Sequence, residues 1–128
     1  MIIGVDPGRD KCGVAVLNSE CDVKFSKVVP TDELELTLQK LSVQFDVELV
    51  ILGNGTTHID AENKIKALNL SVEVIDEKFT TEQARKLYWK KNPPHGWRKL
   101  LPTSMQVPPD PVDNLVAEIL VLRHLNGA

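Results

Sequence analysis

The sequence lacks any long hydrophobic run. Its uninterrupted apolar stretches span only a few residues, far short of the roughly 20 that a membrane-spanning helix needs. The N-terminal segment also carries no cluster of basic residues before an apolar stretch, which a secretion signal would have. These two absences predict a soluble protein in the cytoplasm with no membrane partner.

Aromatic residues and cysteines are scarce. Only 5% of the residues are aromatic, so Val, Leu and Ile must fill the core. The two cysteines, Cys12 and Cys21, form no CxxC pair and have no histidine at metal-ligand spacing, so we interpret them as reduced structural thiols. A chain of 128 residues that is 42% hydrophobic can build one ordinary core, and it contains neither repeat nor linker. We therefore expect one domain over residues 1–128.

The hydrophobic pattern predicts the element order β-β-β-α-β-α-β-α-loop-α. Alternating or continuous apolar runs predict five strands, over residues 2–6, 13–17, 22–29, 48–53 and 71–76. Helical spacing and capping signals predict four helices, from about residue 31 to 45, 60 to 69, 80 to 91 and 110 to 126. Residues 92–110 contain five prolines and should form a loop.

This order of elements predicts an α/β fold. The first three strands follow one another closely and should form an antiparallel meander. Helical crossovers join the later strands, which makes parallel pairing the expected arrangement. The fold class is therefore a mixed five-stranded sheet with helices on both faces.

Three acidic residues are expected to meet at one edge of this sheet. Asp6 ends the first strand, Glu77 follows the last strand, and Asp113 lies in the first turn of the final helix. Ligand sites in such sheets form at the carboxyl ends of parallel strands. Crowded carboxylates repel one another, and a bound Mg²⁺ or Mn²⁺ relieves the repulsion. The arrangement predicts a metal centre suited to phosphodiester hydrolysis.

Each of these acids also has an ordinary structural explanation. Asp6-Pro7-Gly8 is also typical of an ordinary turn after a strand. In the functional interpretation, Gly8 would let the backbone approach a phosphate or a metal-bound water. Glu77 alone reads as a surface acid, and Asp113 reads as a capping carboxylate favoured by the helix dipole. Their shared placement at one edge favours the functional interpretation.

A basic segment follows the predicted acidic site. No acidic residue occurs between Glu82 and Asp110, although the protein carries a net charge of −3. Basic side chains there can bind phosphates, and Trp97 can stack on a base, although Trp97 and Trp89 can equally anchor the loop. The predicted nucleic-acid-binding residues are Arg85, Lys86, Lys90, Lys91, Trp97, Arg98 and Lys99.

Four segments together resemble the YqgF, or RuvC-like, branch of the ribonuclease H-like superfamily, whose members are described as Holliday junction resolvases. They occur in the order found in that family and are IIGVDPGRDKCGVAV, VILGNGT, VIDEKFTTEQAR and PVDNLVAEIL. The likeness covers nearly the whole chain. In the proline-rich segment, it extends to a variant of the family with a P-P-x-G-W-R-x-L-x-P sequence.

The resemblance implies metal-dependent nuclease activity. Asp6, Glu77 and Asp113 match the acids of the family motifs and would be both metal ligands and catalytic residues. The family implies processing of ribosomal RNA precursors or resolution of branched, Holliday-junction-like DNA, and related resolvases act as homodimers on two-fold symmetric junctions. The chain departs from true resolvases at Gly53-Asn54, where they carry a glutamate. Asp76 or Asp110 as a further ligand, and one metal or two, both stay open.

Two other function classes are compatible with parts of the pattern. One is a non-catalytic nucleic-acid-binding module of the same fold, but retention of all three matched acids argues against it. The other is nucleotide binding of the actin and sugar-kinase type, which also uses a strand and a glycine-bearing turn. Those proteins need two such domains around a cleft, and 128 residues supply one.

Overall fold

The protein is described by a computed structural model that covers residues 1–55, 57–76 and 113–125. A five-stranded sheet forms its centre, in the order β3-β2-β1-β4-β5. β1 pairs antiparallel with β2, which pairs antiparallel with β3, whereas β1, β4 and β5 are parallel. The strands are β1 (Ile2–Asp6), β2 (Lys11–Leu17), β3 (Val23–Pro30), β4 (Leu49–Gly53) and β5 (Val72–Ile75).

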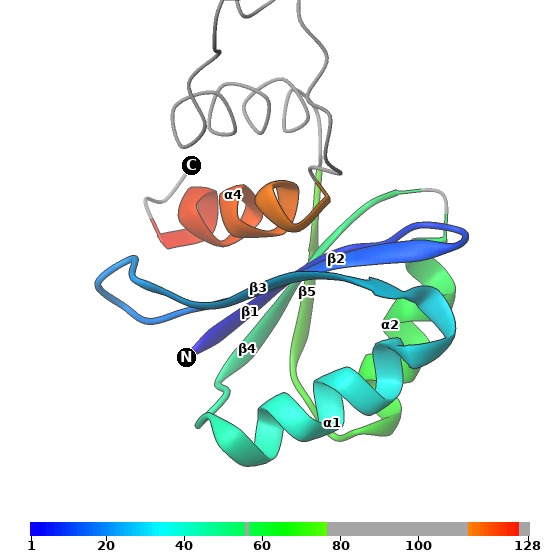
Figure 1. The fold of residues 1–128 in the computed structure, drawn as a ribbon, viewed down its shortest axis with the longest axis horizontal. Helices are drawn as coiled ribbons and strands as arrows, with labels where there is room; N and C mark the ends of the chain where they lie inside the picture. Colours follow the sequence, from blue (N-terminus) through cyan, green and yellow to red (C-terminus); the bar gives the residue numbers. More distant parts are fainter. Residues whose placement is uncertain (56, 77–112, 126–128) are drawn as a thin grey trace, which may run out of the picture.

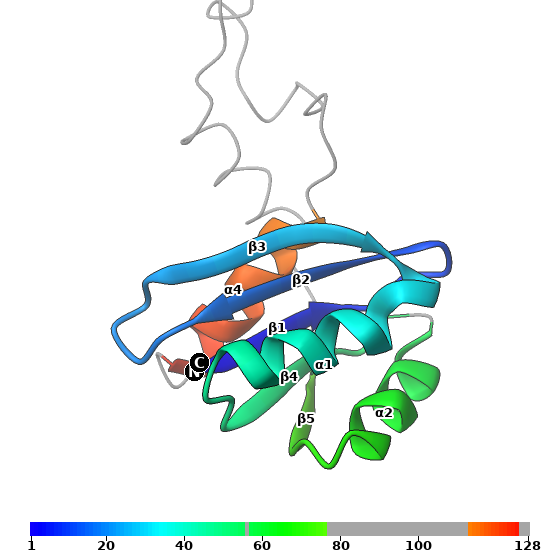
Figure 2. The same cartoon turned by 60° about the horizontal axis from the view of Figure 1, so that its bottom comes forward.

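Helices cover both faces of the sheet (Figure 1). The helices are the 3₁₀ turn η1 (Thr31–Glu33), α1 (Leu34–Gln44), α2 (His58–Ala67) and α4 (Asp113–Leu125). α1 and α2 lie on one face and α4 lies on the other, as Figure 2 also shows. The mixed α/β sheet predicted from the sequence is confirmed. The helix predicted over residues 80–91 and the loop over 92–110 lie outside the described residues.

Strand alternation decides which side chains meet which helix layer. In β1, Ile3 and Val5 belong to the core under α1 and α2, whereas Ile2 faces α4. β4 is buried on both faces, because Val50 and Leu52 belong to the core under α1 and α2 and Ile51 belongs to the core under α4. The continuous apolar run of β4 thus reflects its position inside the sheet.

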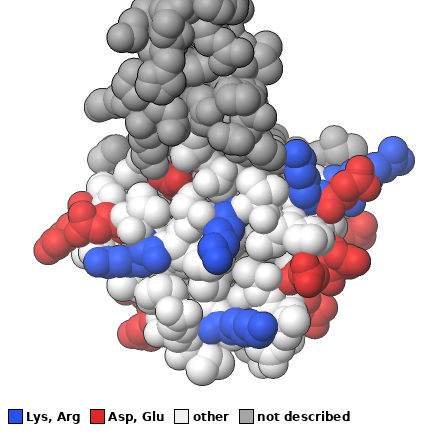
Figure 3. Space-filling view, in the orientation of Figure 1, with Lys and Arg blue, Asp and Glu red and all other residues white. Residues whose placement is uncertain are grey.

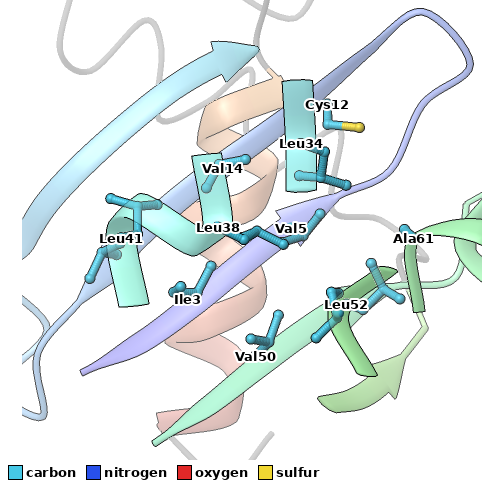
Figure 4. Close-up of a cluster of buried hydrophobic side chains, with 12 residues drawn as sticks. Ile3, Val5, Cys12, Val14, Leu34, Leu38, Leu41, Val50, Leu52 and Ala61 are labelled. Carbon is cyan, nitrogen blue, oxygen red and sulfur yellow. The ribbon is translucent and has the colours of Figure 1, made fainter. Parts of the chain in front are cut away.

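The core under α1 follows from the spacing of its leucines. Leu34, Leu38 and Leu41 recur at helical intervals and are each at most 3% exposed. They pack on β-strand residues such as Ile3 and Val14, as Figure 4 shows. Cys12 is buried in this cluster, as expected for a structural thiol, while Cys21 is exposed, and both are free thiols.

α4 packs so closely on β1 that only glycine fits beneath it. A Cβ atom on Gly4 would lie 2.7 Å from Val121 Cγ2 and nearer still to the carbonyl oxygen of Ala117. Gly4 pairs with Ala15, and Ala15 pairs with Ser26. α4 therefore packs on a row of three small residues that crosses β1, β2 and β3.

The observed boundaries differ from the predicted ones by about two residues. β2 begins at Lys11 because its antiparallel ladder continues to Pro30, and α2 begins at His58. Proline is tolerated at the end of β3 because this strand lies at the sheet edge. Within the described ranges, no helix is long and apolar enough to cross a bilayer.

Candidate functional site

Asp6 stands at the carboxyl end of the central strand. It is the last residue of β1 and pairs with Gly13 of β2. Because side chains alternate along a strand, Asp6 belongs to the same face as Ile2 and Gly4, which is the face that α4 covers. The residue is partly exposed, so its carboxylate is accessible from outside the core.

The carboxyl ends of β4 and β5 lie beside each other at the same edge. The backbone N–H of Asn54, directly after β4, donates to the carbonyl oxygen of Ile75 at 3.0 Å. The exposed residue Asp76 follows, and its carbonyl oxygen accepts a hydrogen bond from Arg123 of α4 at 3.3 Å. Glu77 comes next in the chain and lies outside the described residues. The described chain thus reaches Asp76 at the edge where β1 and β4 also end.

α4 brings its first residue to this edge as well. Its start lies on the side of the sheet where the parallel strands end, and it runs back across β1 (Figures 1 and 2). Ala117 sits over Gly4. Asp113 precedes Ala117 by one helical turn, about 6 Å, and Asp6 follows Gly4 by about 6.6 Å of strand. Asp113 therefore begins α4 one helical turn before the residue that lies over Gly4, and the next residue, Asn114, contacts Ser26 of β3.

The turn after Asp6 is held by Thr31. The hydroxyl of Thr31 donates to the carbonyl oxygen of Gly8 at 2.9 Å, and its backbone N–H donates to the carbonyl oxygen of Asp10, also at 2.9 Å. A Cβ atom on Gly8 would collide with the carbonyl oxygen of Lys11. The structure thus gives Gly8 a role in closing the turn, in agreement with the interpretation of Asp6-Pro7-Gly8 as a simple turn. Close approach of Gly8 to a ligand stays a prediction.

Three polar residues that sequence reasoning missed join α4 to β3. Asn114 Nδ2 donates to Ser26 Oγ at 2.9 Å, and the Ser26 hydroxyl donates to Glu118 Oε2 at 2.6 Å. Glu118 is only 2% exposed and is the buried charged residue of the described chain. Its position within the apolar run LVAEILVL is the one signal that could have drawn attention to it.

The predicted metal ligands are placed only in part. Among the residues that the structure describes, no three His, Cys, Asp or Glu side chains come together as a possible metal site. The predicted set is not complete among these side chains, because Glu77 lies outside the described residues and Asp113 is described by its backbone alone. The joint role of Asp6, Glu77 and Asp113 stays a prediction.

The predicted nucleic-acid-binding residues, from Arg85 to Lys99, all lie outside the described residues. On the face seen in Figure 3, the described Lys and Arg side chains are spread over the surface, and those at the upper right lie beside acidic side chains. This part of the surface shows no continuous basic patch among the described residues. The binding role of the segment from Arg85 to Lys99 stays a prediction.

Comparison with known proteins identifies similar solved structures. No protein-family model matches the sequence, and no curated protein is significantly similar to it. The structure of Thermus thermophilus RuvC in complex with a Holliday junction substrate matches with a TM-score of 0.58 and 12% identity, over 98% of this chain and 95% of that one. A second Thermus thermophilus RuvC structure matches with a TM-score of 0.54 and 12% identity, over 99% and 96% of the two chains. The described part of the chain thus has the fold of these RuvC structures.

Proposed function

We propose that this protein is a nuclease that hydrolyses phosphodiester bonds in structured nucleic acid with the help of Mg²⁺ or Mn²⁺. The supporting observation is the position of Asp6, at the carboxyl end of the central strand on the face that α4 covers. The first residue of α4, Asp113, begins at the same edge. β5 ends at Ile75, two positions before Glu77 in the sequence. The RuvC fold supports the same assignment.

The donor set fits a hard divalent cation. Asp6, Glu77 and Asp113 would offer only carboxylate oxygens, which Mg²⁺ and Mn²⁺ prefer over nitrogen or sulfur. The partial exposure of Asp6 leaves room for a ligand that is itself solvated. When bound, the metal would activate a water and neutralise charge on the reacting phosphate. Asp76 and Asp110 are the candidates for a further ligand.

Each part of the chain has its own task in this proposal. Asp6 is held by the β1 ladder and by the turn that Thr31 fixes, so its carboxylate is presented from a rigid base. The basic residues between Arg85 and Lys99 hold the phosphate backbone, and Trp97 stacks on an unpaired base. Binding and cutting would thus use different segments of one domain of residues 1–128.

For the substrate, we propose branched DNA or a structured ribosomal RNA precursor. The RuvC structure with a Holliday junction supports the first, and the sequence resemblance supports the second. A homodimer would match the two-fold symmetry of a junction, and light scattering of the protein with and without a four-way junction measures it. We expect the protein to act in the cytoplasm.

The test is cleavage of a four-way DNA junction and a structured precursor RNA in Mg²⁺ or Mn²⁺. Asp6→Asn and Asp113→Asn should each lower the cleavage rate by at least about 100-fold while leaving the melting temperature nearly unchanged. Asp46→Asn is the matched control, because Asp46 is exposed and lies at the opposite end of β1, where its carbonyl oxygen accepts from the amino group of Met1 at 3.0 Å. Equal rates in all four proteins would refute the proposal.

One observation favours a second candidate, a non-catalytic nucleic-acid-binding module. β4 ends in Gly53 and Asn54, where the resolvases that the sequence resembles carry a glutamate. Loss of that acid would weaken a metal centre. If the wild-type protein binds junctions or RNA tightly but cleaves neither in either metal, this second function is the correct one.

A further inference from the structure

We infer that Ser26, Asn114 and Glu118 are positioning residues that fix the start of α4, and hence Asp113, relative to the end of β1. This inference rests on the proposed function, because it gives the three residues a role in building the metal centre. It concerns polar groups that touch neither metal nor substrate in the proposal. Their task is to hold the backbone that carries a proposed ligand.

The hydrogen bonds run in one direction. The Asn114 amide donates to Ser26 Oγ at 2.9 Å, and the Ser26 hydroxyl donates onward to Glu118 Oε2 at 2.6 Å. A serine hydroxyl has one proton and can accept as well, so one side chain of β3 engages both partners. The bond to Glu118 is short, as expected when the acceptor is a carboxylate.

The spacing of the two α4 residues gives the network its effect. Asn114 and Glu118 are four residues apart, so they lie on one face of the helix in consecutive turns. Ser26 Oγ lies between them. A slip of α4 by one residue would move each group by about 1.5 Å and turn it by about 100°, which would break both bonds. The network thus fixes the helix along its axis and around it.

The small residues beneath α4 cannot fix its alignment by packing, so polar contacts must do so. Gly4, Ala15 and Ser26 form one row across three strands. Gly4 and Ala15 have almost no side chain that could hold the helix in one position along the sheet. Gly4 allows the closest approach to Ala117 and Val121. Small residues set how near α4 comes to the sheet, whereas the hydroxyl of Ser26 sets which helical turn sits above it.

Burial of Glu118 argues against a purely stabilising role. Its neighbours Ala117 and Ile119 are buried and apolar, and Glu118 itself is 2% exposed. Apolar residues of similar volume often replace buried ion pairs with no loss of stability. A buried carboxylate is therefore not needed at this position for packing alone. In some proteins a buried polar group instead fixes the alignment of an element, and we assign this role to Glu118. The residue directly before Asn114 is Asp113, the proposed ligand.

The experiment compares wild-type protein with Ser26→Ala, which removes both hydrogen bonds, and Ser26→Thr, which keeps the hydroxyl. Ser42→Ala is the matched control, since its hydroxyl donates to Gln39 within α1 at 2.7 Å, away from α4. The first readout is amide hydrogen exchange of Ala117 and Glu118 without metal, because their N–H groups bond to the first turn of α4. Exchange should be about tenfold faster in Ser26→Ala, with residues 122–125 unchanged.

The second readout is direct binding of Mn²⁺, followed by the electron paramagnetic resonance signal of the free ion. The dissociation constant should rise about tenfold in Ser26→Ala and return to near the wild-type value in Ser26→Thr. Unchanged exchange in Ser26→Ala overturns the inference. Faster exchange with unchanged Mn²⁺ affinity also overturns it, because the role is then only structural.

The proposed function fails in a different way. If wild-type protein binds no Mn²⁺, or if Asp6→Asn binds it as well as wild-type protein does, the metal centre itself is refuted and the inference falls with it. If Asp6→Asn abolishes binding while Ser26→Ala does not weaken it, only the inference is refuted. The two outcomes are therefore distinguishable within one set of measurements.

Discussion

Adding one methyl group at Gly4 should push α4 away from the sheet and destabilise the protein. The Cβ atom of Gly4→Ala would lie 2.7 Å from Val121 Cγ2 and closer still to the Ala117 carbonyl oxygen. Ordinary carbon contacts are about 3.5–4.0 Å, so α4 would have to retreat by about 1 Å. The Val121 side chain can rotate, but the Ala117 carbonyl belongs to the helix backbone and moves only with the whole helix.

The expected loss of stability is large for so small a change. Replacing glycine by alanine inside a strand normally helps by about 0.5–1 kcal/mol, because glycine loses more freedom on folding. Overpacking a core costs about 1–3 kcal/mol, and a backbone clash belongs at the upper end. The two effects together leave a net loss, so we expect the free energy of unfolding to fall by about 2 kcal/mol and the melting temperature to fall by about 8 °C.

Urea and thermal unfolding of Gly4→Ala measure this loss. The double variant with Val121→Ala relieves one of the two clashes, so it should be less destabilised than the sum of the two single variants while staying below wild type. The retreat of α4 also carries Asp113 away from Asp6, and Mn²⁺ affinity should fall with it. A Gly4→Ala protein as stable as wild type would refute the close packing of α4 on β1.

Three further predictions follow from the described contacts and the basic segment. Thr31→Val removes the hydroxyl that fixes the turn after β1 and should cost about 1 kcal/mol in urea unfolding, whereas Thr31→Ser should not; an equal loss in both would contradict the role of the hydroxyl. Leu38→Ala should lower the free energy of unfolding by about 3 kcal/mol because Leu38 is 0% exposed. Leu36→Ala, on the 51% exposed side chain of the same helix, is the control and should change it little. Lys90→Glu with Lys91→Glu should weaken junction binding and reduce its salt-dependence slope by up to about 2, and unchanged affinity would exclude phosphate contacts there.

The strands were predictable because their burial follows the chain locally. Ile3 and Val5 alternate with residues of the opposite face, and Val50, Ile51 and Leu52 form an unbroken apolar run. Alternation indicates a strand that is buried on one face, and an unbroken apolar run indicates a strand that is buried on both faces. The parallel pairing of β1, β4 and β5 then followed from the helical crossovers, and with it the meeting of their carboxyl ends at one edge.

The polar link between α4 and β3 was not predictable, because its partners are far apart in the chain. Ser26 and Glu118 are separated by 92 positions. Helical periodicity places Glu118 on a face but does not say which strand that face meets. The same limit applies to Gly8, since the Lys11 carbonyl that excludes a side chain is known only once the turn has closed.

The late position of α4 in the sequence has a consequence for synthesis. α4 supplies most of the buried residues that cover Ile2, Ala15, Leu17 and Ile51, so a nascent chain that has grown only as far as β5 leaves this apolar face uncovered. Folding cannot be completed before α4 has emerged from the ribosome exit tunnel. Until then, the uncovered face is a binding surface for chaperones and a site of self-association.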